Sequence, residues 1–202
     1  MKIRLFGITG KKASGKSSVA KFIRQNNIPV VNIDHIYDNL FQPGTKVHRE
    51  IINCFDYDFL TDAGEIDLKR LSVALCEKEW VKNIIDDIMK EEISIFIERL
   101  IYMFSFHKID IAGIESEVLL NTIMKDYSDY IIMIEAPLKD RCDRLKKLID
   151  ESIIKNIIDM ENKSKWNNYN LLIENNGSIE ELEQKTIMAI KELLLFFKRR
   201  GI

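Results

Sequence analysis

Short runs of hydrophobic residues alternate along the chain with longer segments in which hydrophobic residues recur at helical spacing. The short runs predict buried β-strands, because each is only a few residues long and ends near a glycine or a polar residue. They cover residues 3–9, 29–33, 109–113, 130–134 and 171–173.

The longer segments predict helices, and several of them carry signals for a helix start. They cover residues 17–25, 68–75, 80–100, 137–148 and the segment after 178. Asp67 is placed to cap the second of these helices, and Pro137 suits the first turn of the fourth. Ser178 and Glu181 form a capping box before the last helix. Strands that alternate with helices predict an α/β fold with a parallel sheet.

The size and charge of the chain narrow the functions that this fold could serve. With 202 residues, 46% hydrophobic and 31% charged, the chain is expected to form one globular domain. Its formal net charge of −2 lacks the basic excess of a general nucleic-acid binder. No stretch approaches the roughly 18 apolar residues that span a membrane, and the first residues do not read as a signal peptide. We therefore expect a cytoplasmic protein without a nucleic-acid or membrane partner.

The three cysteines add no chemistry to this picture. Cys54, Cys76 and Cys142 lie far apart and form no C-x-x-C pair. Cysteines of this kind are typical of reduced thiols in a cytosolic protein, and they predict neither a zinc site nor a disulfide framework.

The strongest chemical motif lies between the first strand and the first helix. Residues 10–17 read GKKASGKS and match the phosphate-loop pattern G-x-x-x-x-G-K-[ST]. A chance glycine-lysine turn is the alternative, but a strand before and a helix after the loop are the setting that the motif requires. The sequence therefore predicts nucleotide binding.

The spacing within the motif suits phosphate chemistry. Glycines let the backbone curl so that consecutive N–H groups face phosphate oxygens, and the start of the following helix adds positive potential. Lys16 can reach the β- and γ-phosphates of ATP, and the Ser17 hydroxyl can ligate Mg²⁺. The residues predicted to bind the nucleotide are Gly10, Ala13, Ser14, Gly15, Lys16, Ser17 and Ser18.

Further candidates follow the other strands. Asp34 ends the second strand, where open α/β sheets place their ligands, and its carboxylate could accept a proton or cap the next helix. Glu115 follows the third strand and could hold a magnesium-bound water or a substrate group, or be an exposed loop acid. Arg141 and Arg144 lie three residues apart on one helix face, where they could bind ligand or form a solvated charged surface.

Beyond the loop, the chain resembles the dephospho-CoA kinase family over nearly its whole length. The likeness begins with residues 7–20, which contain the loop, and continues with the second strand, which closes on Asp34 and is followed by a Pro-Gly pair at 43–44. It extends to GEID at 64–67 and to IENNGS at 173–178. The loop is common to many NTPases, whereas the order and spacing of the other segments are more specific.

The resemblance implies a P-loop kinase with a three-layer α/β fold, in which helices flank a parallel five-stranded sheet. The implied single domain has a core at about 1–60 and 106–202. A helical substrate-side region is implied at about 60–105, and a small lid at about 145–165.

The resemblance also implies a reaction, in which ATP phosphorylates the ribose 3′-hydroxyl of 3′-dephospho-CoA to give CoA and ADP. Asp34 would then be the base, while Lys16 and Mg²⁺ on Ser17 would stabilise charge on the transferred group. With a lid that closes over ATP, Arg144 becomes a better candidate than Arg141 for contact with the phosphates.

The sequence departs from the family's pattern at several positions that concern the acceptor. A common arginine falls on Leu68, a His-Pro pair falls on residues 86–87, which are both aspartate, and a Thr-Arg pair falls near residues 161–162. The nearest cations that could substitute are Lys69, Arg70, Lys163 and Lys165.

Two other functions therefore stay open at this point. A kinase with the same core could act on a nucleoside or a nucleotide, and a degenerate P-loop module could bind nucleotide without transferring phosphate. Retention of Lys16, Ser17 and Asp34 argues against the second of these. The sequence does not distinguish a monomer from a small homo-oligomer.

Overall fold

The computed structural model describes residues 3–56, 58–163 and 166–201 and consists of two compact units. The first unit joins Met1–Asn32 to Leu100–Ile202 and contains the sheet, and the second unit is Ile33–Arg99. Among the described residues, none of the helices combines the length and the apolar character needed to cross a membrane.

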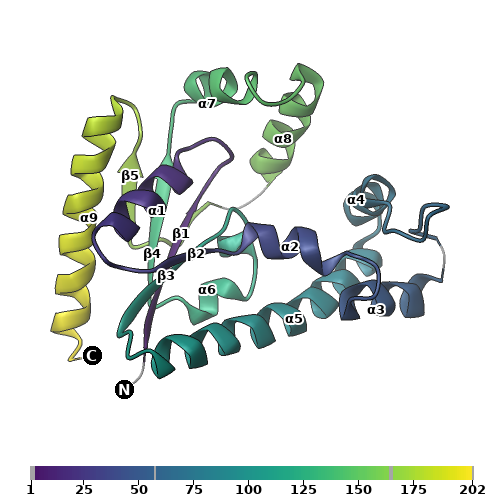
Figure 1. Ribbon diagram of the computed structural model, residues 1–202. Coiled ribbons are helices and arrows are strands. Elements are labelled where there is room, and N and C mark those ends of the chain that lie inside the picture. Colours follow the sequence, from purple (N-terminus) through teal and green to yellow (C-terminus); the bar gives the residue numbers. More distant parts are fainter. Residues whose placement is uncertain (1–2, 57, 164–165, 202) are drawn as a thin grey trace. The chain divides into compact units, whose positions relative to one another are not determined.

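The sheet of the first unit is parallel throughout, as predicted. Its strands are β1 (Arg4–Gly10), β2 (Val30–Asn32), β3 (Ile111–Glu115), β4 (Tyr130–Glu135) and β5 (Leu171–Glu174). They lie in the order β2-β3-β1-β4-β5, so β1 is central (Figure 1). The residues that follow β1 therefore lie in the middle of the carboxyl edge of the sheet, where ligands of open α/β sheets bind.

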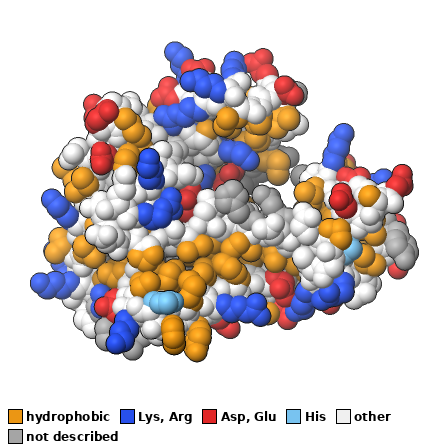
Figure 2. Space-filling view, viewed as in Figure 1, with side chains coloured by type: hydrophobic (Ala, Val, Ile, Leu, Met, Phe, Trp, Pro, Cys, Tyr) orange, Lys and Arg blue, Asp and Glu red, His pale blue; other side chains and the backbone are white. Residues whose placement is uncertain are grey.

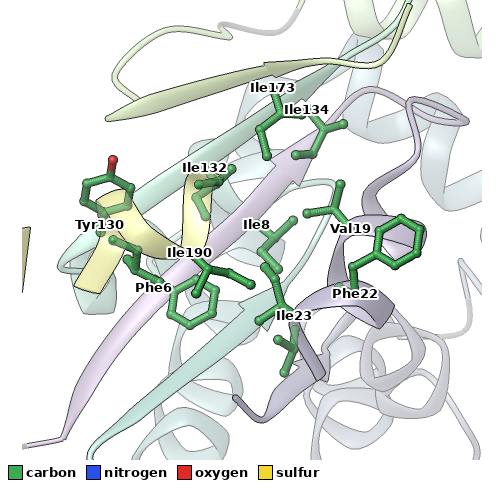
Figure 3. Close-up of a cluster of buried hydrophobic side chains, with 14 of the residues drawn as sticks. Phe6, Ile8, Val19, Phe22, Ile23, Tyr130, Ile132, Ile134, Ile173 and Ile190 are labelled. Atoms are coloured by element: carbon green, nitrogen blue, oxygen red, sulfur yellow. The ribbon is translucent and has the colours of Figure 1, made fainter. Parts of the chain in front are cut away.

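Helices cover both faces of this sheet. Alternate residues of a strand point to opposite faces, and Phe6 and Ile8 of β1 face α1 (Lys16–Gln25) and α9 (Ile179–Arg199), as Figure 3 shows. On the other face, a side chain at Gly7 would collide with Leu119 of the 3₁₀ helix η1 (Leu119–Asn121). The short helix α6 (Met124–Tyr127) follows η1 and also contacts β1.

The core between the sheet, α1 and α9 gives the phosphate loop a rigid base. Ile8, Val19 and Leu193 are fully buried, and they come from β1, α1 and α9 respectively. Each such side chain contributes about 1.5–3 kcal/mol through its removal from water. Both elements that flank the loop, β1 and α1, are thus fixed by packing.

The third strand begins and ends two residues later than the sequence pattern predicts. It was expected at 109–113, with Gly113 at its end, but β3 runs over Ile111–Glu115. The physical reason is that Gly113 lies inside the strand: the Phe6 ring fills the space where a side chain at Gly113 would lie. Glu115 is consequently the last residue of the strand.

Two helices follow β4, and the second of them lies within the range 145–165, whose role as a lid stays a prediction. They are α7 (Leu138–Leu145) and α8 (Glu151–Lys163), and basic and acidic side chains both gather over them (Figure 2). Pro137 precedes the first helical residue, at the N-cap position. The predicted continuation of this helix to residue 148 is wrong, because the chain leaves the helix after Leu145 and Leu148 is 78% exposed.

The second unit is built from helices. They are α2 (Asp34–Leu40), α3 (Lys46–Phe55), α4 (Leu68–Glu77) and most of α5 (Glu79–Phe106). Asp67 caps α4 as predicted, since its carboxylate accepts hydrogen bonds from the backbone N–H groups of Lys69 and Arg70. This unit includes most of the range 60–105, whose role as a substrate-side region stays a prediction.

Candidate nucleotide-binding site

The phosphate loop connects β1 to α1 through several left-handed backbone conformations. Gly10 has φ 152° and Gly15 has φ 106°. A side chain at Gly10 would overlap the Ile134 carbonyl, and one at Gly15 would overlap the Asn175 amide. Both glycines are therefore required by backbone conformation and by the close approach of neighbours.

Lys16 lies back across the loop that precedes it. Its Nζ donates to the carbonyl oxygens of Gly10 at 2.8 Å and Lys11 at 3.2 Å, and it lies 3.9 Å from a carboxylate oxygen of Glu117. The ammonium group is therefore held at the mouth of the loop by one charged and two neutral oxygens. The position of Glu117 beside Lys16 was not predicted.

Ser17 and Glu115 meet at the same edge of the sheet. The Ser17 hydroxyl donates to Glu115 Oε1 at 2.7 Å, and Glu115 is only 1% exposed. The interpretation of Glu115 as an exposed loop acid is therefore wrong, because this residue ends β3 and does not lie in the loop after it.

The chemistry of this pair fits Mg²⁺, which prefers a few hard oxygen ligands and completes its shell with phosphates and water. Within 3–56, 58–163 and 166–201, no group of three or more His, Cys, Asp or Glu residues could form a metal cage. A metal at the loop would consequently depend on Ser17, on Glu115 directly or through water, and on the nucleotide itself.

Both predicted arginines reach the loop from α7. Arg144 Nη1 donates to the Ala13 carbonyl at 2.9 Å. Arg141 Nε donates to the Lys12 carbonyl at 2.8 Å, and its guanidinium also forms an ion pair with Glu161 of α8. Arg141 is 3% exposed, so the expectation of a solvated charged surface is wrong for this residue.

Two further residues at the loop were missed by sequence reasoning. Asn175, interpreted only as part of the turn after β5, donates from Nδ2 to the Ser14 carbonyl at 2.8 Å and is buried. Glu161 accepts a hydrogen bond from the Lys12 N–H at 2.8 Å. The available signal for Glu161 was that a family position near residues 161–162 carries a different residue type.

Three of the remaining candidates, Asp34, Lys69 and Arg70, belong to the second unit. Asp34 is the first residue of α2, with Ile33 at the N-cap position, so the residue placed to cap this helix is one earlier than expected. Lys69 and Arg70 lie in the first turn of α4 and line a surface pocket of about 510 Å³ together with Lys78. Lys165 and the side chain of Lys163 lie outside the described residues.

Comparison with known proteins finds one family over most of the chain. The sequence model of the family described as dephospho-CoA kinase matches residues 4–181. A dephospho-CoA kinase of Oryza sativa subsp. japonica is 28% identical over 189 residues, which are 91% of this chain and 81% of the relative. One from Legionella pneumophila is 30% identical over 145 residues, or 70% of this chain and 69% of the relative.

Solved structures agree on the fold. A protein from Thermus thermophilus superposes with a TM-score of 0.71 at 19% identity, covering 96% of this chain and 99% of its own. A dephospho-CoA kinase from Campylobacter jejuni has a TM-score of 0.56 at 16% identity, covering 95% and 98%.

Proposed function

The chain belongs to the dephospho-CoA kinase family, and we propose on this basis that it phosphorylates the ribose 3′-hydroxyl of dephospho-CoA with ATP, giving CoA and ADP. The observation that carries the proposal is that the family model matches residues 4–181 of this chain. The site agrees with it, since Lys16 lies across the phosphate loop and Ser17 is hydrogen-bonded to Glu115 at the end of β3. As a member of this family, the protein is an enzyme that uses ATP and a small-molecule acceptor. The balance of 30 basic and 32 acidic residues lacks the basic excess of a general nucleic-acid binder, and the proposed place of the reaction is the cytoplasm.

The roles of the residues follow from the charge that moves during phosphoryl transfer. The 3′-hydroxyl oxygen bonds to the γ-phosphorus, the bond to the β–γ bridging oxygen breaks, and the hydroxyl proton goes to Asp34. Lys16 stabilises the negative charge on the transferred group, and the amides of residues 14–17 bind the phosphates. Arg144, just before the predicted lid, already donates to the Ala13 carbonyl of the loop and would reach the same phosphates when the lid closes.

Mg²⁺ is the proposed metal, and it would supply positive charge beside the β- and γ-phosphates when bound. Ser17 would hold it directly, and the Glu115 carboxylate would orient a bound water or ligate it. Lys69, Arg70 and Arg141 are proposed on the substrate side. In the structure, the Arg70 guanidinium donates to the Asp58 carbonyl, and that of Arg141 donates to the Lys12 carbonyl.

Replacing Glu115 by glutamine tests the metal role. We expect the Mg²⁺ concentration for half-maximal activity to rise by about tenfold or more, because the neutral amide keeps the size of the side chain but loses the charge that attracts the cation. Activity at saturating Mg²⁺ should largely recover. An unchanged Mg²⁺ dependence in the folded variant would show that Glu115 holds the loop and not the metal.

The acceptor is tested by ADP production at fixed ATP with dephospho-CoA, adenosine and AMP. We expect kcat/KM for dephospho-CoA to exceed the others by at least about tenfold, which is about 1.4 kcal/mol of transition-state binding. Its pyrophosphate and pantetheine arm can bind away from the reacting hydroxyl and position it.

The same assay separates the alternatives. A preference for AMP or a nucleoside would make this a kinase of another acceptor, as the departures at Leu68 and residues 86–87 favour. Absence of transfer to every acceptor, with ATP still bound, would instead identify a nucleotide-binding module.

A further inference from the structure

The outer turn of the phosphate loop is held by charged side chains from α7 and α8. The Lys12 peptide is bound on both sides: its N–H donates to Glu161 Oε1 and its carbonyl accepts from Arg141 Nε, each at 2.8 Å. The next carbonyl, of Ala13, accepts from Arg144, and the carbonyl after it, of Ser14, accepts from Asn175. Side chains from outside the loop thus bind three consecutive residues.

The central element of this arrangement is the buried ion pair between Arg141 and Glu161. Their side chains are 4% and 6% exposed, so both charges are almost completely removed from water. A buried pair of this kind is favourable only when further hydrogen bonds satisfy its remaining donors and acceptors, and its best-attested role is to fix one arrangement of the elements that carry it. Here the additional partners are the N–H and C=O groups of Lys12.

The backbone conformation of Ala13 is one that neighbouring contacts must stabilise. This residue has φ 60°, a left-handed conformation that costs a non-glycine residue about 1–3 kcal/mol and persists only where the surroundings enforce it. The bonds to Lys12 precede this strained residue, and Arg144 donates to the carbonyl of Ala13 itself. The orientation of the amides at 14–17, which face phosphate, depends on the turn that Ala13 makes.

We propose that Glu161 is a positioning residue for ATP: through Arg141 and the Lys12 peptide, it keeps the strained turn at Ala13 in the conformation that binds phosphate. It acts through the loop and does not touch the nucleotide. The proposal rests on the proposed function only in that the loop binds ATP. It is tested by ATP binding, which can be measured whether or not dephospho-CoA is the acceptor.

The test compares Glu161→Gln with Glu151→Gln on the same helix. Glu151 forms an exposed ion pair with Lys146 at 2.9 Å, and the hydrogen bond from Lys146 lowers the pKa of Glu151. Exposed pairs of this kind contribute little. By titration calorimetry, we expect Glu161→Gln to raise the Kd for ATP about tenfold and Glu151→Gln to change it less than about twofold. Equal Kd values in the two folded variants would overturn the proposal.

A double exchange separates positioning from a purely structural role. Arg141→Glu combined with Glu161→Arg restores opposite charges, but neither new side chain can make the hydrogen bond to Lys12 that its predecessor made. We expect the melting temperature to recover relative to Glu161→Gln while the ATP affinity stays low. Recovery of wild-type affinity in this variant would mean that the ion pair alone matters.

The unmodified protein supplies a measurement that does not depend on any variant folding. The Lys12 N–H is bonded to a buried carboxylate, so its hydrogen exchange in the ATP-free protein should be slowed at least about a hundredfold relative to an unprotected amide. Exchange at the unprotected rate would show that Glu161 does not hold the loop before ATP binds, and would exclude the positioning role.

Discussion

Lys16→Ala is expected to lower kcat by about a thousandfold or more, because the variant removes the positive charge that stabilises the transferred phosphoryl group. In the structure this charge is already placed: Nζ is hydrogen-bonded to the Gly10 and Lys11 carbonyls at the mouth of the loop. It therefore needs little reorganisation when the γ-phosphate enters, and preorganised charges are the ones that contribute most to catalysis. Steady-state ADP production measures the loss.

The fold should survive this change. Lys16 is not part of the hydrophobic cluster between the sheet, α1 and α9, and alanine favours a helix more than lysine does. Lys21→Ala is the matched control, because Lys21 lies on the same helix with its side chain exposed. Near-normal turnover by folded Lys16→Ala would place the phosphate-transfer site elsewhere.

Asp34→Asn should lower kcat by about a hundred- to ten-thousandfold, the usual effect of losing a general base. The amide keeps the size of the carboxylate but cannot take the proton of the acceptor hydroxyl. Because Asp34 begins α2, its negative charge also interacts favourably with the helix dipole, which is typically worth about 0.3–1 kcal/mol. A small decrease in melting temperature is therefore expected beside the loss of turnover.

The ratio of these two effects identifies the role of Asp34. If kcat is retained and only the melting temperature falls, the carboxylate stabilises the start of α2 and the base is another residue. Asp62→Asn provides the control, since it makes the same change at an exposed position of the same unit.

The family departures gain a partial explanation from the structure. Near residues 161–162, where the resemblance places a Thr-Arg pair, this chain carries Glu161, which is buried against Arg141 and bound to the loop. In the positioning role proposed above, this residue supports the phosphate loop. Leu68, where the resemblance places an arginine, begins α4 and is 54% exposed, with Lys69 and Arg70 beside it.

The sequence alone determined the features that depend on near neighbours in the chain. Apolar runs predicted the five parallel strands, and glycine spacing predicted the phosphate loop. Both signals are local, because a short buried strand and a tight turn each depend on a few consecutive residues. The Asp67 cap was equally local, since the carboxylate bonds to N–H groups two and three residues away. The family match then followed from the order of these segments.

Only the tertiary structure decided which distant side chains share the loop. Ser17 and Glu115 are 98 residues apart, Lys12 and Glu161 are 149 apart, and Ser14 and Asn175 are 161 apart. No local pattern marks such pairs, because a charged residue on a helix face is usually solvated, and Arg141 and Glu161 appear in the sequence as two ordinary surface charges. Arg141 and Glu161 are buried because the strand order brings α7 and α8 to the carboxyl edge of β1. There the two side chains form hydrogen bonds with backbone groups of the loop.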